Sequence, residues 1–235
     1  MIRNGVRPLL AQEAFVAWLR QEGQARYHDR HPFHLLMHAG QLSRPQLQQW
    51  VLNRYYYQTR IPIKDALILS KSEDAGFRRI WIRRIHDHDG SDEGIGGLAL
   101  WLKLAEGVGL DPEEVAGCRG VLPGVRQACD HYVELVREWS LVEAVASSLT
   151  ELFAPRLMSQ RLLAWEQHYP WIKPGSLDYF RARVGQANHD AEHALAFVLN
   201  ASSYFEQEQC VKALILKTTI LWGLLDALHA EYVGR

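Results

Sequence analysis

Cationic and aromatic residues recur on helix faces that the apolar periodicity of the sequence predicts to be buried. Arg54, Tyr57 and Gln58 have the i, i+3, i+4 spacing of one helix face, and Lys64 follows along the same segment. A buried cation is costly unless a partner or a ligand compensates its charge. This face therefore predicts either ion pairs within the core or a site for an anion.

Three further segments repeat the pattern. Tyr179, Arg183 and Gln186 are spaced along one helix face, Arg161 lies on a second, and Lys217 interrupts the apolar run ALILKTTILW. Core salt bridges and snorkelling side chains are one interpretation. The carboxylates available for such salt bridges are Asp65, Glu151 and Asp190. The set as a whole favours a cavity for a flat, polyanionic small molecule, in which Arg holds carboxylates and His and Tyr move protons.

Two histidine pairs have the spacing of metal ligands on one helix face. His34 and His38, and likewise His189 and His193, lie at i, i+4. Without carboxylates placed beside either pair, solvated or hydrogen-bonded histidines are favoured, and we expect no metal. Residues 94–99, GIGGLA, match the pattern GxGxxA, but the preceding HDHDGSDE is no strand, so a dinucleotide site is not predicted.

The elements that must position these residues are predicted to be helices. Apolar residues recur at i, i+3, i+4 and i+7 between turn signals, and clear period-two runs are missing. The fold class is therefore all-α, a compact bundle of about seven helices in a single domain over residues 1–235. The main predicted segments are residues 12–24, 32–40, 43–62, 66–72, 74–88, 123–139, 141–169, 176–200 and 203–233, together with a helix that follows the turn at 89–91 and runs through Trp101 to about Gly107.

Local signals refine several of these segments. Ser43, Asp74 and Ser176 are predicted N-caps. Pro62 predicts a kink or the start of a new helix, and Pro155 predicts a kink inside the helix over residues 141–169.

Composition excludes several classes of function. The chain has 235 residues, 48% of them hydrophobic, and its 26 Lys and Arg balance 27 Asp and Glu. No basic excess is present, so we expect no nucleic-acid partner. The three cysteines form no disulfide or zinc pattern, and neither a secretory signal nor a membrane span is recognised, which together predict a cytoplasmic location.

Long strings resemble one enzyme family, the pyrroloquinoline-quinone (PQQ) synthases. These strings are RYHDRHPFHLLMHAG, WVLNRYYYQTRIPIKDA, RIHDHDG, SSLTELFAP, QHYPWIK, YFRARVGQANHDAEH and ILWGLLDA. The resemblance implies a seven-helix bundle similar to haem oxygenase and to the TenA thiaminases, assembled as a homodimer. It also implies ring closure and eight-electron oxidation of a bicyclic tricarboxylate precursor by O2, releasing H2O2. No metal or organic redox cofactor takes part, and PQQ is the product.

The resemblance also implies roles for individual residues. His88 matches the family's proton-transferring histidine, and catalytic roles are further expected for Tyr179, Arg183, His28, Glu151 and Tyr132 around the quinone core and oxygen site. Expected substrate-binding residues are Tyr27, His28, Arg54, Tyr57, Gln58, Lys64, Arg84, Arg161 and Lys217.

One position departs from the family pattern. Met158, seven residues after Glu151, stands where the family has a histidine on the oxygen side of the pocket. Methionine neither carries a proton nor donates a strong hydrogen bond. Later oxidation steps are therefore expected to be slower, or to move protons through Tyr179 and a water.

Three alternatives remain open. A di-iron oxidase of the same fold would need a His-x3-Asp-x2-His run, which here begins with Gln186, and a carboxylate where Trp81 stands. A non-catalytic carrier of PQQ or its precursor is consistent with Met158. A thiaminase-like activity would need a nucleophilic cysteine, and Cys118, Cys129 and Cys210 lie in no such motif.

Overall fold

The computed structural model describes residues 7–92 and 94–234, apart from the side chain of Asn188, and within these residues it is all-α, as predicted. The longer helices are α1 (Gln12–Arg26), α3 (Arg44–Ser70), α4 (Ala75–Asp89), α5 (Gly97–Gly107), α7 (Pro123–Glu138), α9 (Ala154–His168), α10 (Asp178–Val198) and α11 (Tyr204–Tyr232). The shorter elements are α2 (Pro32–His38), α6 (Pro112–Ala116), α8 (Leu141–Ser147) and the 3-10 helices η1 (His28–Arg30), η2 (Ser148–Phe153) and η3 (Pro174–Leu177).

Two predicted helix starts are confirmed by their hydrogen bonds. Ser43 forms a capping box with Gln46 at the start of α3, and the Asp74 carboxylate accepts hydrogen bonds from the first backbone N–H groups of α4. The predicted start of a new helix at Pro62 is wrong, because α3 continues through it. A proline removes one backbone hydrogen bond, and the long buried face of α3 outweighs that loss.

Two other predictions need correction. Residues 141–169 do not form one helix kinked at Pro155: α8 ends at Ser147, η2 intervenes, and Pro155 lies in the first turn of α9, where its missing N–H costs nothing. Ser176 does not cap the next helix, because its hydroxyl donates to the Lys173 carbonyl and α10 begins after η3.

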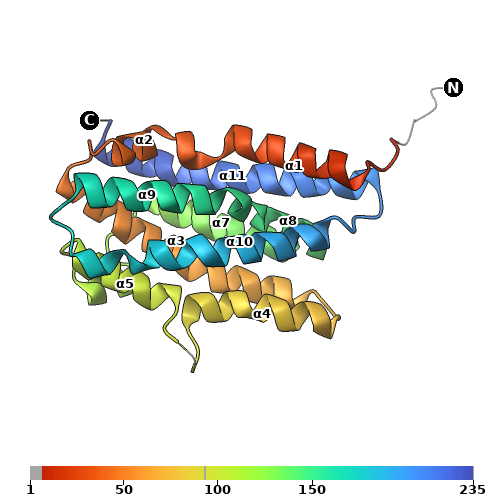
Figure 1. The fold of residues 1–235 in the computed structure, drawn as a ribbon, viewed down its shortest axis with the longest axis horizontal. Coiled ribbons are helices and arrows are strands. Elements are labelled where there is room, and N and C mark those ends of the chain that lie inside the picture. Colours follow the sequence, from red (N-terminus) through yellow and green to blue (C-terminus); the bar gives the residue numbers. More distant parts are fainter. Residues whose placement is uncertain (1–6, 93, 235) are drawn as a thin grey trace.

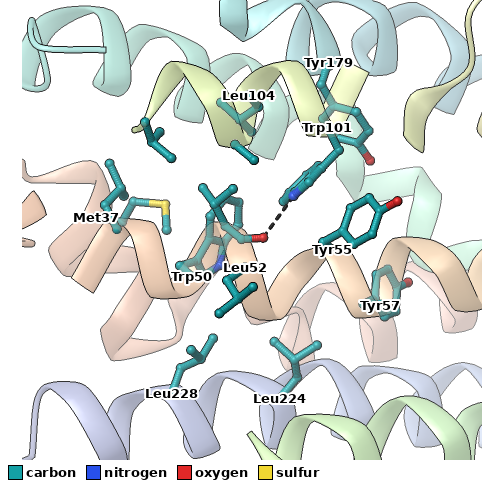
Figure 2. Close-up of a cluster of buried hydrophobic side chains, with 14 of the residues drawn as sticks. Met37, Trp50, Leu52, Tyr55, Tyr57, Trp101, Leu104, Tyr179, Leu224 and Leu228 are labelled. Atoms are coloured by element: carbon teal, nitrogen blue, oxygen red, sulfur yellow. Dashed lines mark hydrogen bonds between the residues drawn. The ribbon is translucent and has the colours of Figure 1, made fainter. Parts of the chain in front are cut away.

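The helices run roughly along one direction (Figure 1). Helix α11 packs against α1, α7 and α8, while α3 packs against α4 and α7, and α10 lies against α9 and η2. Two apolar clusters form the core. In the first, Trp101 Nε1 donates to the Val51 carbonyl at 3.0 Å, and Leu224 and Leu228 of α11 approach from the other side (Figure 2). The second cluster surrounds Phe77 and Trp81.

Gly96 of the GxGxxA pattern, together with the preceding Gly90, lies in a tight loop between α4 and α5. Gly90 has a φ of +94°, and a Cβ on Gly96 would lie 2.4 Å from the carbonyl oxygen of His88. Only glycine permits this approach, so the pattern positions the end of α4 rather than a dinucleotide. No described helix has the length and apolarity needed to cross a membrane.

Candidate active site

A cavity lies among the helix faces that were predicted to be buried and polar. About 520 Å³ of space there is free of protein atoms, part of it open to solvent. Its lining comes from Tyr27, which follows α1, and from η1, α3, α4, η2, α9, α10 and α11, so residues from both ends of the sequence meet there. The lining residues are Tyr27, His28, Arg54, Tyr57, Gln58, Ile61, His88, Thr150, Glu151, Ala154, Met158, Tyr179, Arg183 and Leu221.

Carboxylates compensate one set of buried cations. Lys64 Nζ lies 2.7 Å from Asp65 Oδ1 and also donates to Ser148 Oγ at 2.8 Å. Arg84 contacts Asp65 at 3.3 Å and donates from one nitrogen to both oxygens of Glu151, at 2.6 and 2.7 Å. Burial alone would raise the pKa of Asp65, but Lys64 and Arg84 together hold it below its ordinary value.

Arg183 joins the same network from α10. It lies 3.8 Å from Glu151 and 3.6 Å from Asp190, and Arg84 also lies 3.6 Å from Asp190. Burial raises the pKa of Asp190 to about 6 against the opposing effect of Arg84. Core salt bridges are therefore confirmed for Lys64, Arg84 and Arg183.

A second set of buried cations has no carboxylate partner in the described residues. The Arg54 guanidinium lies 3.9 Å from the centre of the Tyr57 ring, and Lys217 Nζ lies 3.3 Å from that of Tyr132 and 4.4 Å from that of Tyr57. Arg161, 2% exposed, contacts the Trp50 and Phe180 rings and His34.

Burial shifts the acid–base equilibria of these unpaired cations. It lowers the pKa of Lys217 well below its ordinary value, with Lys64 and Arg54 adding to the effect. Burial and the neighbouring Arg54 lower the pKa of Arg161 to about 9. The surroundings of both groups thus favour loss of their positive charge, and an anionic ligand would oppose that tendency.

Two histidines in the cavity wall are neutral at pH 7. Burial and Arg183 lower the pKa of His88 to about 4, and its Nδ1–H donates to the Arg84 carbonyl at 3.0 Å. The lone pair of His88 is therefore on Nε2, which can accept a proton. Burial, followed by Arg54 and Arg161, lowers the pKa of His28 well below its ordinary value.

Two tyrosines donate defined hydrogen bonds. The Tyr179 hydroxyl donates to Gln58 Oε1 at 3.0 Å, and burial raises the pKa of that tyrosine. The Tyr132 hydroxyl lies 2.9 Å from Ser147 Oγ, whose own proton goes to the Ala144 carbonyl, so Tyr132 is the donor. Both phenols remain protonated and can act as proton donors.

The cavity includes most, but not all, of the residues expected at the site. Ten of them line it, whereas five lie outside its lining: Tyr132, Lys64, Arg84, Arg161 and Lys217. The cavity is also lined by four residues that were not predicted, Ile61, Thr150, Ala154 and Leu221. Helical spacing could have indicated some of these, because Leu221 lies one turn after Lys217 and Ala154 one turn before Met158.

Residues that were considered as metal ligands, in the Gln186–Asp190–His193 run and in the His34/His38 pair, contact other side chains or the backbone instead. Arg84 and Arg183 both contact Asp190 of the Gln186–Asp190–His193 run. Both ring nitrogens of His34 have partners, the His28 carbonyl and Arg161. Within residues 7–92 and 94–234, no group of three or more His, Cys, Asp or Glu side chains is arranged to hold a metal ion.

The cysteines are poor nucleophiles. Cys129 and Cys210 are fully buried, and burial raises the pKa of each thiol to about 12. Burial also raises the pKa of Cys118. Because the thiolate is the reactive form, a thiaminase-like role for any of them is disfavoured.

Solved structures define the class of fold. The model superposes with a TM-score of 0.75 on a domain of unknown function with a heme oxygenase-like fold from Shewanella denitrificans, at 15% identity and over 95% of this chain and 94% of that one. A TenA homologue from P. horikoshii gives a TM-score of 0.72 at 12% identity, over 94% of this chain and 99% of that one. The fold is thus that of the haem-oxygenase-like helical bundles.

Sequence comparison gives the family within that class. The TENA/THI-4/PQQC family model matches residues 17–227, and the chain belongs to this family. It is 50% identical over 223 residues to a pyrroloquinoline-quinone synthase from Rhizobium meliloti, covering 94% of this chain and 87% of the relative. A pyrroloquinoline-quinone synthase from Rhizobium rhizogenes is 52% identical over 225 residues, covering 95% and 91%.

Proposed function

We propose that the protein is a pyrroloquinoline-quinone synthase. In this role it closes a ring of a bicyclic tricarboxylate precursor and oxidises the product by eight electrons with O2, releasing H2O2 and PQQ. The identity of about one half to synthases over nearly the whole chain supports the assignment. The substrate itself gives electrons to oxygen, so the protein's part is to hold carboxylates, move protons and stabilise reduced oxygen.

The observation that carries the proposal is the set of three buried cations without carboxylate partners. Arg54, Arg161 and Lys217 provide up to three positive charges, while the other buried cations are already paired. A ligand with three carboxylates would balance this set. Arg54 lines the cavity and can donate charge-assisted hydrogen bonds, while Arg161 and Lys217 lie behind the lining and would attract the ligand through their charge.

Proton transfer is assigned to groups in the cavity wall. His88, neutral with its lone pair on Nε2, is the base for ring C–H protons. Tyr179 and His28 are placed to donate to or accept from the quinone oxygens and reduced oxygen. Glu151 contacts Arg84 and Arg183. Its role is to hold Arg183, which lines the cavity, and not to act as a base.

A second candidate is a non-catalytic carrier of PQQ or of its precursor. Met158 favours it, because this thioether lines the cavity where the family resemblance expects a histidine. The two candidates share the same binding groups and differ only in turnover.

Anaerobic mixing with the reduced bicyclic precursor tests the proposal. Metal-stripped protein is expected to give the spectrum of a bound quinoid, and admission of O2 should then yield PQQ and peroxide. No spectral change would refute the synthase, and binding of PQQ without conversion of precursor would favour the carrier. Arg54→Gln should weaken precursor binding, whereas the exposed Arg79→Gln serves as the matched control.

We further propose a cytoplasmic homodimer. The family resemblance supports the dimer, and the absence of disulfides among the three cysteines is consistent with a reducing compartment. Sedimentation equilibrium of the full chain checks the assembly, with a mass near that of one chain as the result that overturns it.

A further inference from the structure

A neutral histidine is the hydrogen-bond partner of the buried Arg161. One terminal nitrogen of Arg161 lies 3.2 Å from His34 Nε2. The guanidinium carbon lies 4.8 Å from the centre of the Trp50 ring and 5.8 Å from that of Phe180. Every one of these partners is uncharged if His34 is neutral, so the positive charge of Arg161 is not cancelled.

The second nitrogen of His34 determines its tautomer. His34 Nδ1 lies 3.0 Å from the His28 carbonyl oxygen, which can only accept, so Nδ1 bears the proton. The lone pair is then on Nε2 and accepts from Arg161. Burial and Arg161 lower the pKa of His34 well below its ordinary value, which keeps the ring in this neutral form.

The contact also ties Arg161 to the cavity wall. His28, whose carbonyl anchors His34, lines the cavity, and Arg161 follows the lining residue Met158 by one turn of α9. The positive charge of Arg161 acts on Tyr27 and Tyr179, which also line the cavity. The guanidinium therefore lies behind the wall that a ligand would contact.

Two other buried arginines, Arg84 and Arg183, are held by charged acceptors instead of a neutral one. Arg84 and Arg183 are held by Glu151 and Asp190, which fix the guanidinium groups but neutralise them. We propose that His34 is a positioning residue that fixes Arg161 through a neutral acceptor and so leaves its charge available to a carboxylate of the ligand. This inference rests on the proposed function, because it assumes an anionic ligand.

Three substitutions separate position from charge. His34→Gln keeps a neutral acceptor within reach of Arg161, His34→Glu replaces it with an acceptor of similar length that bears a charge, and His34→Leu removes it. With PQQ as the probe, we expect the dissociation constant to change less than about threefold for Gln, and to rise at least about tenfold for Glu and for Leu. Equal binding by the Gln and Glu variants would overturn the inference.

Two measurements distinguish positioning from a merely structural role. The KM for the precursor should rise in the Glu variant while kcat changes less than about threefold, because the lost interaction is with a bound carboxylate. In an Arg161→Met background, His34→Leu should no longer weaken PQQ binding. An unchanged tenfold effect in that background would show that His34 acts elsewhere.

A readout without ligand separates this inference from the proposed function. The imidazole 15N spectrum of the ligand-free protein at pH 7, assigned by comparison with His34→Gln, should show a neutral ring protonated on Nδ1. A charged ring, or a proton on Nε2, overturns the inference whatever the protein binds. Failure of the wild type to bind PQQ or convert the precursor refutes the proposed function, and the spectrum still decides the state of His34.

Discussion

The ammonium nitrogen of Lys217 lies 3.3 Å from the centre of the Tyr132 ring, and no hydrogen-bond acceptor contacts it within the described residues. The negative face of the ring offsets part of the cost of burying the charge, but an aromatic ring is a weaker partner than a carboxylate. Burying this amine without a hydrogen-bond acceptor therefore costs the free protein stability. The Tyr57 ring, 4.4 Å away, belongs to the other apolar cluster, so Lys217 lies between the two clusters.

Replacing this cation should stabilise the protein and impair binding. Lys217→Met is expected to raise the free energy of unfolding by about 1–3 kcal/mol, because a similar apolar side chain replaces a buried amine that has no hydrogen-bond acceptor among the described residues. The same change should weaken PQQ binding at least about tenfold. Urea denaturation and titration with PQQ measure the two effects. Lys212→Met, on the exposed face of α11, is the control, and a less stable Lys217→Met protein would contradict the argument.

Removing a paired charge should have the opposite effect. Glu151→Gln leaves Arg84 and Arg183 without the carboxylate that they share, and we expect a loss of about 3–5 kcal/mol of unfolding free energy. Chemical denaturation measures the loss, and the exposed Glu134→Gln should change stability by less than about 0.5 kcal/mol. If Glu151→Gln leaves the free energy of unfolding unchanged, Asp65 and Asp190 alone compensate both arginines.

Met158→His should introduce a proton donor into the cavity wall, where the family resemblance expects a histidine on the oxygen side. We expect faster late oxidation steps, measured as oxygen uptake together with the decay of quinoid intermediates after O2 is admitted to the precursor complex. Met158→Leu keeps an apolar side chain of similar size and should leave those steps unchanged. If both variants behave like the wild type, the departure at Met158 does not limit oxygen handling.

Stability should fall as the pH falls below about 6.5, in part because His88 stays neutral in the folded protein. Its folded pKa is about 4, below the ordinary value of 6.5, so the unfolded chain takes up the proton first. The contribution of this residue is fully present above pH 6.5 and is lost at about 1.4 kcal/mol per pH unit down to about pH 4.

A comparison of wild type with His88→Asn isolates this effect. Asp190, whose pKa is raised to about 6, acts in the opposite direction, because its contribution is lost as the pH rises toward 6. This contribution is common to both proteins and cancels in the difference. Urea midpoints between about pH 7 and pH 5 should fall less steeply for the variant, and parallel slopes would show that His88 titrates normally.

Local signals were sufficient for two helix starts whose contacts are local. The Ser43 capping box and the Asp74 cap involve residues within one helical turn, and both were predictable. The placement of Pro155 was not, because η2, which separates α8 from α9, packs against α10 and α11. Whether a proline kinks a helix or begins one depended on that distant packing.

The sequence by itself determined that cations occupy buried helix faces, since helical periodicity and the cost of burying charge are properties of each segment. Tertiary structure decided which cations are compensated. Arg84 finds Glu151 across 67 residues of chain, and Arg161 finds His34 across 127. Ion pairing requires contact within a few ångströms, and no spacing within one helix reports a contact between helices. The division between paired cations and the unpaired Arg54, Arg161 and Lys217 therefore exists only in the folded bundle.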